Sequence, residues 1–231
     1  MKQVYFLTPF PEIVKAVVTE SILGRAEKKG LVQFNIKNLF DFSDPPHHRI
    51  DDYPFGGGAG MILKPEPVFR VIDAIKAKSW SGDNNHILFP TPDGKLFLQT
   101  DAGKLAKSEK LVFICGHYKG LDQRVRDELV TNEYSIGDYV LTGGDLAALV
   151  MIDSIVRLIP GVLNKSESAE TDSHSDPLLD HPHYTRPKEF RGIKVPEILL
   201  SGHHSNIYKW RQKKRLEKTI VRRPDIVKEK N

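Results

Sequence analysis

Cysteine and long apolar runs are the two features that this sequence most clearly lacks. Cys115 is the only cysteine among 231 residues, so the chain can form no intrachain disulfide and no cysteine-based zinc site. No run approaches the roughly 18 consecutive apolar residues that a transmembrane helix needs. We therefore expect a cytoplasmic protein with no membrane partner.

The common nucleotide-binding and metal-binding motifs are missing as well. The chain contains no GxxxxGK(S/T) phosphate loop and no HExxH, and Gly56–Met61 (GGGAGM) lacks the last glycine of the GxGxxG fingerprint. His174, His181 and His183 could in principle share an ion, but they have no regular spacing and no cysteine to complete a site. The sequence therefore predicts no metal site.

Charge is nearly balanced over the whole chain, at +4, but it is unevenly distributed. Residues 201–231 hold ten Lys and Arg against three acids, whereas residues 1–200 carry a net charge of −3. A basic segment behind a slightly acidic body favours a polyanionic partner, most simply a nucleic acid. The alternative is a helix whose charged face is merely solvated.

Apolar periodicity predicts an α/β domain over residues 1–160. Strands are expected at 4–7, 31–40, 86–89, 111–115 and 134–141, and helices from Pro11 to Gly30 and at 65–78, 96–106, 121–130 and 145–159. The alternation favours a mainly parallel sheet with helices on both faces. Residues 161–180 lose all periodicity and are predicted to be an interdomain linker, and residues 181–231 a small, basic helical domain.

Three glycine-bearing turns follow predicted strands: PTPDG at 90–94, GHYKG at 116–120 and GGD at 143–145. Ligands of open α/β sheets bind outside the carboxyl ends of the strands, and glycine allows the backbone to approach them closely. Each turn alone could be an ordinary tight turn. Together they predict a pocket that is lined by backbone and suits a ligand with an adenine and no phosphate.

A second group of polar residues lies in the predicted linker, where Ser166–Ser173 (SESAETDS) is followed by His183–Pro187 (HYTRP). Charged groups on a structured loop are often functional, whereas a solvated linker has a similar composition. Spacing alone does not distinguish Asp172 from Glu167 or Glu170.

Four of these segments, taken in order, resemble the bacterial tRNA (guanine-37-N1)-methyltransferase family. They are GGGAGM at 56–61, GHYKG at 116–120, SIGDYVLTGGD at 135–145 and HYTRP at 183–187. The resemblance extends over essentially the whole chain. It implies the SPOUT fold with a deep trefoil knot, S-adenosylmethionine as cofactor, tRNA as substrate and a homodimer whose active sites are shared between subunits.

The resemblance also implies site residues. Those matching the cofactor pocket are Phe89, Pro90, Thr91, Pro92, Gly94, Gly116, Tyr118, Lys119, Gly120, Ile136, Gly137, Tyr139, Leu141, Gly143 and Gly144. The family's general base falls on Asp172, and its arginine near the transferred methyl falls on Arg157. Residues expected to contact tRNA are Gly57, Gly58, Gly60, Met61, Ser173, Arg186, Lys213, Lys214 and Arg215.

Two residues in the GHYKG turn depart from the family's pattern. Lys119 stands where the family commonly has an acid that is tied to magnesium dependence, and His117 stands where it commonly has an arginine. The reversed charge at position 119 makes a magnesium role there doubtful. Two alternatives also remain open: a knotted methyltransferase that modifies another RNA group, and a nucleic-acid-binding module that has lost catalysis.

Overall fold

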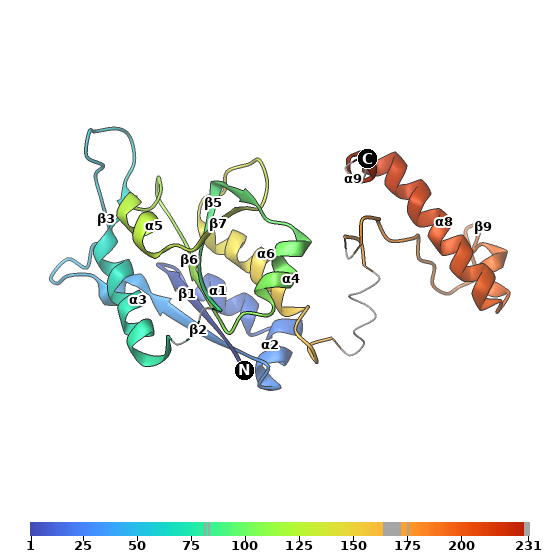
Figure 1. Ribbon diagram of the computed structural model, residues 1–231, viewed down its shortest axis with the longest axis horizontal. Coiled ribbons are helices and arrows are strands. Elements are labelled where there is room, and N and C mark those ends of the chain that lie inside the picture. The colour runs from blue at the N-terminus through green and yellow to red at the C-terminus, as the bar shows by residue number, and fades with distance from the viewer. Residues whose placement is uncertain (81, 83, 164–171, 175, 229–231) are drawn as a thin grey trace. The chain divides into compact units, whose positions relative to one another are not determined.

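Figure 1 shows the computed structural model, which describes the chain apart from residues 81, 83, 164–171, 175 and 229–231. The chain divides into two compact units, Met1–Asn164 and Lys165–Asn231. The division falls inside the interval 161–180 that the sequence predicts as a linker. Among the described helices, none is both long and apolar enough to cross a membrane.

A five-stranded, all-parallel sheet forms the centre of the N-terminal unit (Figure 1). Its strands are β1 (Lys2–Thr8), β2 (Val32–Asn38), β5 (Asn85–Leu96), β6 (Lys110–Ile114) and β7 (Asn132–Ser135), in the order β2-β1-β6-β5-β7. Neighbouring strands pair in parallel at every step of that order. The predicted mainly parallel sheet is thus confirmed, and the family resemblance identifies the fold as SPOUT.

Helices cover both faces of the sheet, as predicted. They are α1 (Pro11–Val18), α2 (Ser21–Lys28), α3 (Pro65–Ser79), α4 (Gln99–Leu105), α5 (Gln123–Leu129) and α6 (Gly144–Val156). Successive strand residues point to opposite faces. On β6, Leu111 and Phe113 join the apolar cluster under α1, α2, α4 and α6, whereas Val112 and Ile114 join the cluster under α3 and α5.

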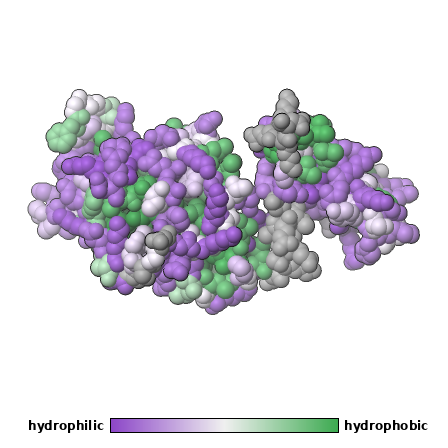
Figure 2. All heavy atoms as spheres, in the orientation of Figure 1, coloured by the Kyte–Doolittle hydropathy of each residue, from purple (hydrophilic) through white to green (hydrophobic). Residues whose placement is uncertain are grey.

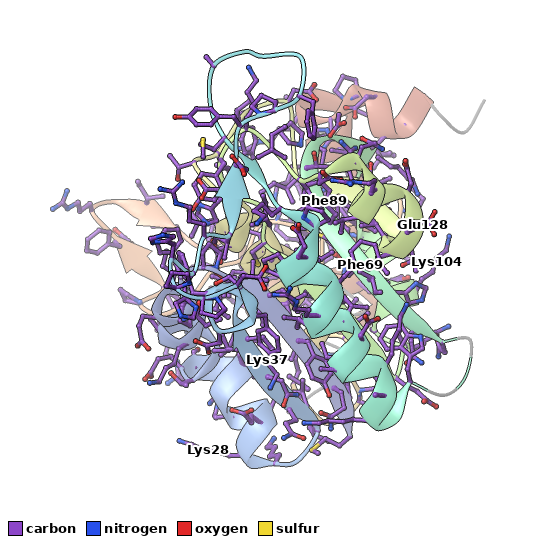
Figure 3. The ribbon with its side chains drawn as sticks, turned by 90° about the vertical axis from the view of Figure 1, so that its left-hand side faces the viewer. Lys28, Lys37, Phe69, Phe89, Lys104 and Glu128 are labelled. Carbon is purple, nitrogen blue, oxygen red and sulfur yellow. The ribbon has the colours of Figure 1, made fainter. Side chains whose placement is uncertain are left out.

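The cluster under α3 and α5 also holds Phe89 of β5. Figure 3 labels this residue together with Phe69 of α3, which packs against the same cluster. The guanidinium of Arg126, on α5, lies 5.5 Å from the centre of the Phe89 ring. Phe89 therefore links this core to residues 90–94, the first glycine-bearing turn, which follow it directly in β5.

The prediction of one helix from Pro11 to Gly30 is wrong. Pro11 does occupy the first turn of α1, but Glu20 is extended and α2 begins at Ser21. A Cβ on Gly24 would lie 2.1 Å from the carbonyl oxygen of Thr19, so this glycine permits the tight connection. Figure 2 shows hydrophobic residues at the surface between hydrophilic ones. On α1, Ile13 and Val17 are both 42% exposed.

The ends of β5 and β7 also differ from prediction. β5 continues beyond Phe89 to Leu96, and both Pro90 and Lys95 pair with Tyr134, so the residues between them bulge from the strand. β7 ends at Ser135, and residues 136–143 form a loop instead of the predicted strand continuation. Because both changes lie at the same edge of the sheet, they widen the region that the three turns surround.

The shorter elements flank these two cores. A 3-10 helix (Leu39–Phe42) follows β2, and a two-stranded sheet of β3 (Asp51–Asp52) and β4 (Ile62–Leu63) brackets the glycine-rich loop. The C-terminal unit holds a hairpin of β8 (Glu189–Phe190) and β9 (Ile193–Lys194), a 3-10 helix (Glu197–Leu200), α8 (His204–Arg222) and α9 (Pro224–Lys228). The predicted helical tail is confirmed.

Candidate cofactor and catalytic site

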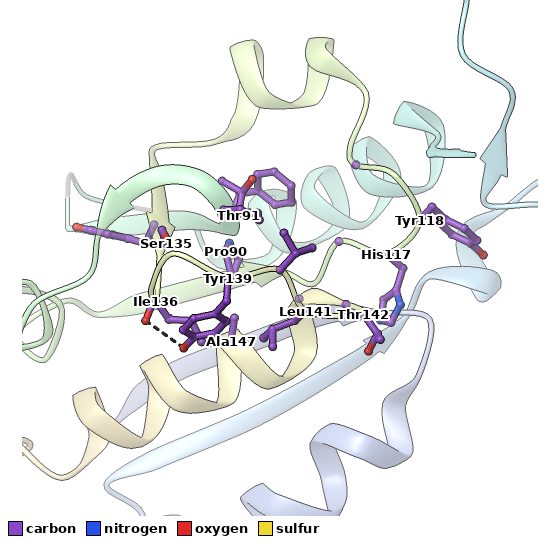
Figure 4. Close-up of a pocket in the computed structure, with 18 of the residues that line it drawn as sticks. Pro90, Thr91, His117, Tyr118, Ser135, Ile136, Tyr139, Leu141, Thr142 and Ala147 are labelled. Atoms are coloured by element: carbon purple, nitrogen blue, oxygen red, sulfur yellow. Dashed lines mark hydrogen bonds between the residues drawn. The ribbon is translucent and has the colours of Figure 1, made fainter. Parts of the chain in front are cut away.

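The three glycine-bearing turns surround one cavity of about 150 Å³ at the carboxyl ends of β5, β6 and β7 (Figure 4). Fourteen of the fifteen residues predicted for the cofactor pocket line it. The exception is Gly94, which packs against β7: a Cβ there would lie 2.6 Å from the backbone nitrogen of Tyr134. Gly94 thus allows the β5 bulge to contact the neighbouring strand directly.

Close backbone packing explains the glycines of the other two turns. A Cβ on Gly144 would lie 2.8 Å from the backbone nitrogen of Gly116, and the Gly144 N–H donates to the Gly116 carbonyl at 2.6 Å. A Cβ on Gly116 would lie 2.8 Å from the Phe89 ring, and one on Gly143 would lie 2.2 Å from the His117 ring. Any side chain at these positions would displace a cavity wall.

The cavity is also lined by six residues that were not predicted for the cofactor pocket: His117, Tyr134, Ser135, Val140, Thr142 and Ala147. Four of them, all except Tyr134 and Ala147, lie within the recognised segments. Tyr134 stands at the end of β7, and Ala147 lies one helical turn after Gly143 on α6. Residues four apart on a helix lie on the same side, so the position of Ala147 four residues after Gly143 could have indicated that it lines the cavity.

The 136–143 loop is held by contacts of its own. Gly137 has φ +150°, a conformation that favours glycine, and it lies against the Tyr139 ring. Its N–H donates to Ser135 Oγ at 3.2 Å, and the Tyr139 hydroxyl donates to the Ile136 carbonyl at 3.2 Å, the dashed line in Figure 4. These contacts within the loop fix its shape.

Ion pairs anchor the bulge of β5 on the opposite wall. The Asp93 carboxylate accepts from the Thr91 hydroxyl and, at 2.9 Å, from Arg126, which also pairs with Glu133 at 2.6 Å. These bonds lower the pKa of Asp93, the Thr91 hydroxyl contributing most and Arg126 next. The pKa of Arg126 is raised, chiefly by its bond to Glu133. Thr91 is thus fixed at the cavity edge.

A buried polar group lies next to the cavity at the start of α6. Asp145 is 2% exposed and accepts from Thr8 Oγ1 at 2.5 Å and from His117 Nε2. Burial, and secondly Asp145, raises the pKa of the Cys115 thiol well above its usual value, so this cysteine is a neutral packing residue. The contact with Asp145 holds His117 against Gly143.

The cavity walls carry little charge. Among the residues lining the cavity, Lys119 is the only Lys, Arg, Asp or Glu. Its backbone N–H donates to the Met61 carbonyl at 2.8 Å, and the Gly120 carbonyl accepts from the Leu63 N–H at 2.9 Å. These two bonds fix the end of the glycine-rich loop, where Gly57, Gly58 and Gly60 have φ between +80° and +121°, beside the second turn. The predicted substrate loop and cofactor turn are neighbours.

Arg157 does not lie at this cavity. It caps the carboxyl end of α6, whereas Gly143 and Gly144 begin that helix at the cavity. Thirteen residues at 1.5 Å per residue separate the two ends by about 20 Å. Within one chain, the structure therefore does not bring Arg157 together with the residues of the cavity.

The other predicted residues belong to the C-terminal unit. Asp172 is half-buried, and the Oγ of its neighbour Ser173 accepts from the Asp180 N–H at 2.9 Å. Arg186 lines a surface groove with Tyr184 and Lys188. Glu167 and Glu170, the acids weighed against Asp172, lie outside the described residues.

Arg215 is placed differently from what a tRNA contact requires. Its side chain is 10% exposed, its Nη2 lies 2.5 Å from Asp176 Oδ1, and its Nε donates to the Leu179 carbonyl at 3.3 Å. Lys213 and Lys214 remain on the surface, paired with Glu217 at 3.9 and 2.7 Å. Arg215 therefore belongs to the interior of this unit. Of the three basic α8 residues predicted to contact tRNA, Lys213 and Lys214 are the two whose side chains can reach phosphates.

Comparisons with known proteins agree over the whole chain. A family model described as tRNA (Guanine-1)-methyltransferase TrmD matches residues 1–229. The chain is 51% identical over 224 residues to the tRNA (guanine-N(1)-)-methyltransferase of Bacillus subtilis (strain 168), covering 97% of this chain and 91% of the relative. It is 53% identical over 220 residues to the protein of that name from Brevibacillus brevis, covering 95% and 89%.

Proposed function

Because the chain belongs to the tRNA (Guanine-1)-methyltransferase TrmD family, we propose that it transfers a methyl group from S-adenosylmethionine to N1 of guanine-37 in tRNA, just 3′ to the anticodon. The observation that carries this proposal is the convergence of the three glycine-bearing turns on one cavity with the glycine-rich loop attached beside it. We expect the activity in the cytoplasm, where its tRNA substrate is.

The cavity suits the proposed cofactor. S-adenosylmethionine has an adenine and a ribose but no phosphate, and the cavity is built from backbone turns and apolar side chains with no cluster of cations. Backbone N–H and C=O groups exposed where Gly116, Gly143 and Gly144 exclude side chains can bind an adenine edge. When bound, the cofactor supplies an electrophilic methyl on its sulfonium.

Asp172 is the proposed general base. Guanine N1 carries a proton and is a poor nucleophile until that proton is removed, so methylation requires an acceptor within hydrogen-bond reach. A carboxylate on a half-buried segment can accept it, and the Asp180 N–H bonded to Ser173 Oγ helps to hold that segment. Arg157 is proposed to stabilise the negative charge that develops on guanine O6.

The position of Arg157 supports a site shared across a homodimer. Leu146, Val150 and Arg157 recur at spacings of four and seven residues, so they lie along one side of α6. Leu146 and Val150 are 53% and 51% exposed. If two copies pack these sides together in antiparallel fashion, the Arg157 end of one helix meets the cavity end of the other, because a two-fold interface is reciprocal.

The exposed side chains of α1 extend this apolar surface. Phe10, Ile13 and Val17 are 46%, 42% and 42% exposed, and α1 and α6 cover the same face of the sheet. An apolar surface of this kind on one side of a domain is typical of a protein interface. We assign it to the proposed homodimer.

The tRNA is proposed to contact the glycine-rich loop, Ser173, Arg186 and the exposed lysines Lys213 and Lys214. The loop residues Gly57, Gly58, Gly60 and Met61 lie beside the cofactor cavity, where the target guanine must arrive. The lysines can neutralise phosphates farther from the reacting base. Arg215 is left out of this surface because it is buried and paired with Asp176.

Lys119 bears on the proposed role of magnesium. It is the only fully charged side chain lining the cavity, and a cation there repels a divalent ion. We therefore expect S-adenosylmethionine binding to be independent of magnesium in the natural chain and to gain magnesium dependence in Lys119→Glu. Isothermal titration with and without chelator measures this. Equal magnesium dependence in the two proteins would show that position 119 has no such influence.

Incubation with methyl-labelled S-adenosylmethionine and two tRNA transcripts tests the proposed reaction. The transcripts differ only at position 37, guanosine in one and adenosine in the other, and the labelled nucleoside is identified after digestion. We expect label in 1-methylguanosine from the first transcript and none from the second. Label in another nucleoside would indicate a different RNA target, and cofactor binding without transfer would indicate a binding module.

A further inference from the structure

Three possible metal ligands lie together in the C-terminal unit. They are the Asp180 carboxylate and the imidazoles of His181 and His183, none of which is itself assigned to the reaction, although the Asp180 N–H binds Ser173 next to Asp172. Their nearest ligand atoms all lie within 4.8 Å of one another. His183 Nε2 is 2.7 Å from Asp180 Oδ2, and His181 Nε2 is 3.9 Å from Asp180 Oδ1. The two imidazole rings lie 4.3 Å apart. His174, which the sequence analysis considered together with His181 and His183, is not part of this cluster.

The orientation of His181 matches that of a metal-binding histidine. Its Nδ1 lies 3.1 Å from the Pro182 carbonyl, an oxygen that can only accept, so Nδ1 carries the proton. The lone pair of neutral His181 is then on Nε2, the atom facing Asp180. Histidines that bind metals usually donate their other ring N–H to a carbonyl or carboxylate in this way.

The backbone that carries the three ligands is anchored to α8. The Leu179 N–H donates to Thr219 Oγ1 at 2.9 Å, and Lys218 Nζ donates to the Asp180 carbonyl at 2.9 Å. Lys218 binds the backbone oxygen and not the Asp180 carboxylate, whose Oδ1 accepts from the His181 backbone N–H at 2.6 Å and whose Oδ2 faces His183 Nε2. Pro182 between the histidines further limits the backbone. Ligands on a supported backbone lose little freedom when an ion binds.

We propose that Asp180, His181 and His183 form a binding site for a divalent transition-metal ion of the zinc class. Two imidazole nitrogens and one carboxylate oxygen suit zinc, cobalt or nickel better than magnesium or calcium, which prefer oxygen ligands alone. Tetrahedral zinc holds such ligand atoms about 3.4 Å apart. The atoms observed at 2.7–4.8 Å reach that spacing by small side-chain rotations.

Ion binding would replace the hydrogen bond between His183 and Asp180. The proton leaves His183 Nε2 for solvent while Nδ1 carries one, so the neutral imidazole offers its Nε2 lone pair to the ion. The His183 side chain is 68% exposed, so the ion has a route from solvent and water can fill the fourth position. Since the Asp180 N–H also binds Ser173 Oγ, a bound ion would fasten the segment next to Asp172 onto α8.

Cobalt titration of the full-length, tag-free protein tests this site. Cobalt(II) in a site with two nitrogens and an oxygen gives visible absorption bands, and zinc displaces it. We expect one tight equivalent in the natural chain, and binding at least about tenfold weaker in His181→Gln, His183→Gln and Asp180→Asn. The control is the double variant His203→Gln/His204→Gln, which removes two histidines outside the cluster and should bind as the natural chain does.

Thermal unfolding provides the second measurement. Zinc should raise Tm of the natural chain and of the control, and leave Tm of the three cluster variants unchanged, because an ion stabilises only the state that binds it. Equal Tm values without metal would show that the variants fold. Equal cobalt affinity in all five proteins, or no binding by the natural chain, would overturn the proposal. Neither result depends on methyl transfer.

Discussion

The two units of this chain differ in what fills their interiors. The N-terminal unit buries apolar side chains on both faces of its sheet, whereas the described part of the C-terminal unit buries Leu179, Arg215 and Thr219. Arg215 is held by Asp176 at 2.5 Å, and Thr219 accepts from the Leu179 N–H at 2.9 Å. Apolar packing tolerates exchange of similar side chains, but a buried charge such as that of Arg215 depends on the polar partners that hold it.

This difference parallels the proposed division of labour. The cofactor cavity needs a fixed shape, and it lies where strand ends and glycines pack backbone against backbone. The proposed general base, Asp172, has to meet a large substrate, and its neighbour Ser173 is held by a polar contact with Asp180 of the same unit. Substitutions should therefore affect cofactor binding in one unit, and transfer or tRNA affinity in the other.

Asp172→Asn should have the largest effect on transfer. The amide keeps the shape of the carboxylate but does not accept the guanine proton, so the rate of methyl transfer should fall by about a hundredfold or more. The affinity for S-adenosylmethionine should be unchanged, because the cavity belongs to the other unit. Single-turnover kinetics and calorimetry measure the two quantities, with Glu197→Gln, an exposed acid of the same unit, as control. Retained transfer would remove Asp172 from the role of base.

Gly144→Ala should have the largest effect on the cofactor. Its new methyl would collide with the Gly116 backbone, so we expect at least about tenfold weaker S-adenosylmethionine binding and about 2–4 kcal/mol lower unfolding free energy. Gly103→Ala is the matched control: its Cβ would meet no atom within 4 Å, and alanine favours the interior of α4. If both variants bind the cofactor equally, the cavity does not depend on this packing.

Arg215→Met tests whether the polar interior of the C-terminal unit is required for its fold. Loss of the bonds to Asp176 and Leu179 should lower stability by about 1–3 kcal/mol. Hydrogen exchange should then speed up at residues 176–183 and stay unchanged in the N-terminal sheet. Lys214→Met, which removes an exposed charge from the same helix, should leave both unchanged. Slower exchange, or none of the expected loss, would contradict the structural role of Arg215.

Lys213→Gln/Lys214→Gln should have the smallest effect. Both side chains are exposed, so each can give up at most about one phosphate contact. We expect KM for tRNA to rise a few-fold and the salt dependence of binding to flatten by about one to two units of slope, with kcat unchanged. Lys28→Gln, on α2 of the other unit, is the control. An unchanged salt slope would mean that the two lysines are only solvated.

The parallel sheet, most helices and nearly all of the cavity could be predicted from the sequence. Periodicity found α3 and α6 because their buried residues recur at helical spacing, and glycines marked the turns around the cavity. The break after Val18 was missed, because it depends on Gly24 approaching the Thr19 carbonyl. Local patterns do not report such a contact.

Contacts between distant residues account for the rest. Asp145 bonds both His117, 28 residues earlier, and Thr8, 137 residues earlier, and the segments that hold His117 and Asp145 do not indicate these contacts. The burial of Arg215 depends on Asp176, about 40 residues away, so the charge alone indicated a phosphate contact. The bulge of β5 arises from its pairing with β7 on both sides of residues 91–94.

The proposed shared site leads to one decisive experiment with mixed dimers. One partner carries Asp172→Asn. The other carries Thr142→Trp, chosen because Thr142 is exposed and lines the cavity, and first shown to fold, dimerise and no longer bind S-adenosylmethionine. Each homodimer should be inactive. In a heterodimer with shared sites, one site carries both lesions and the other carries neither.

Co-expression followed by a methyl-transfer assay on the dimer pool gives the measurement. Random pairing makes about half of the dimers heterodimers, each with one intact site, so about a quarter of the natural activity should return. If each site lay within a single chain, every site would carry one lesion and no activity would return. Absence of activity in a pool shown to contain heterodimers would contradict the shared site.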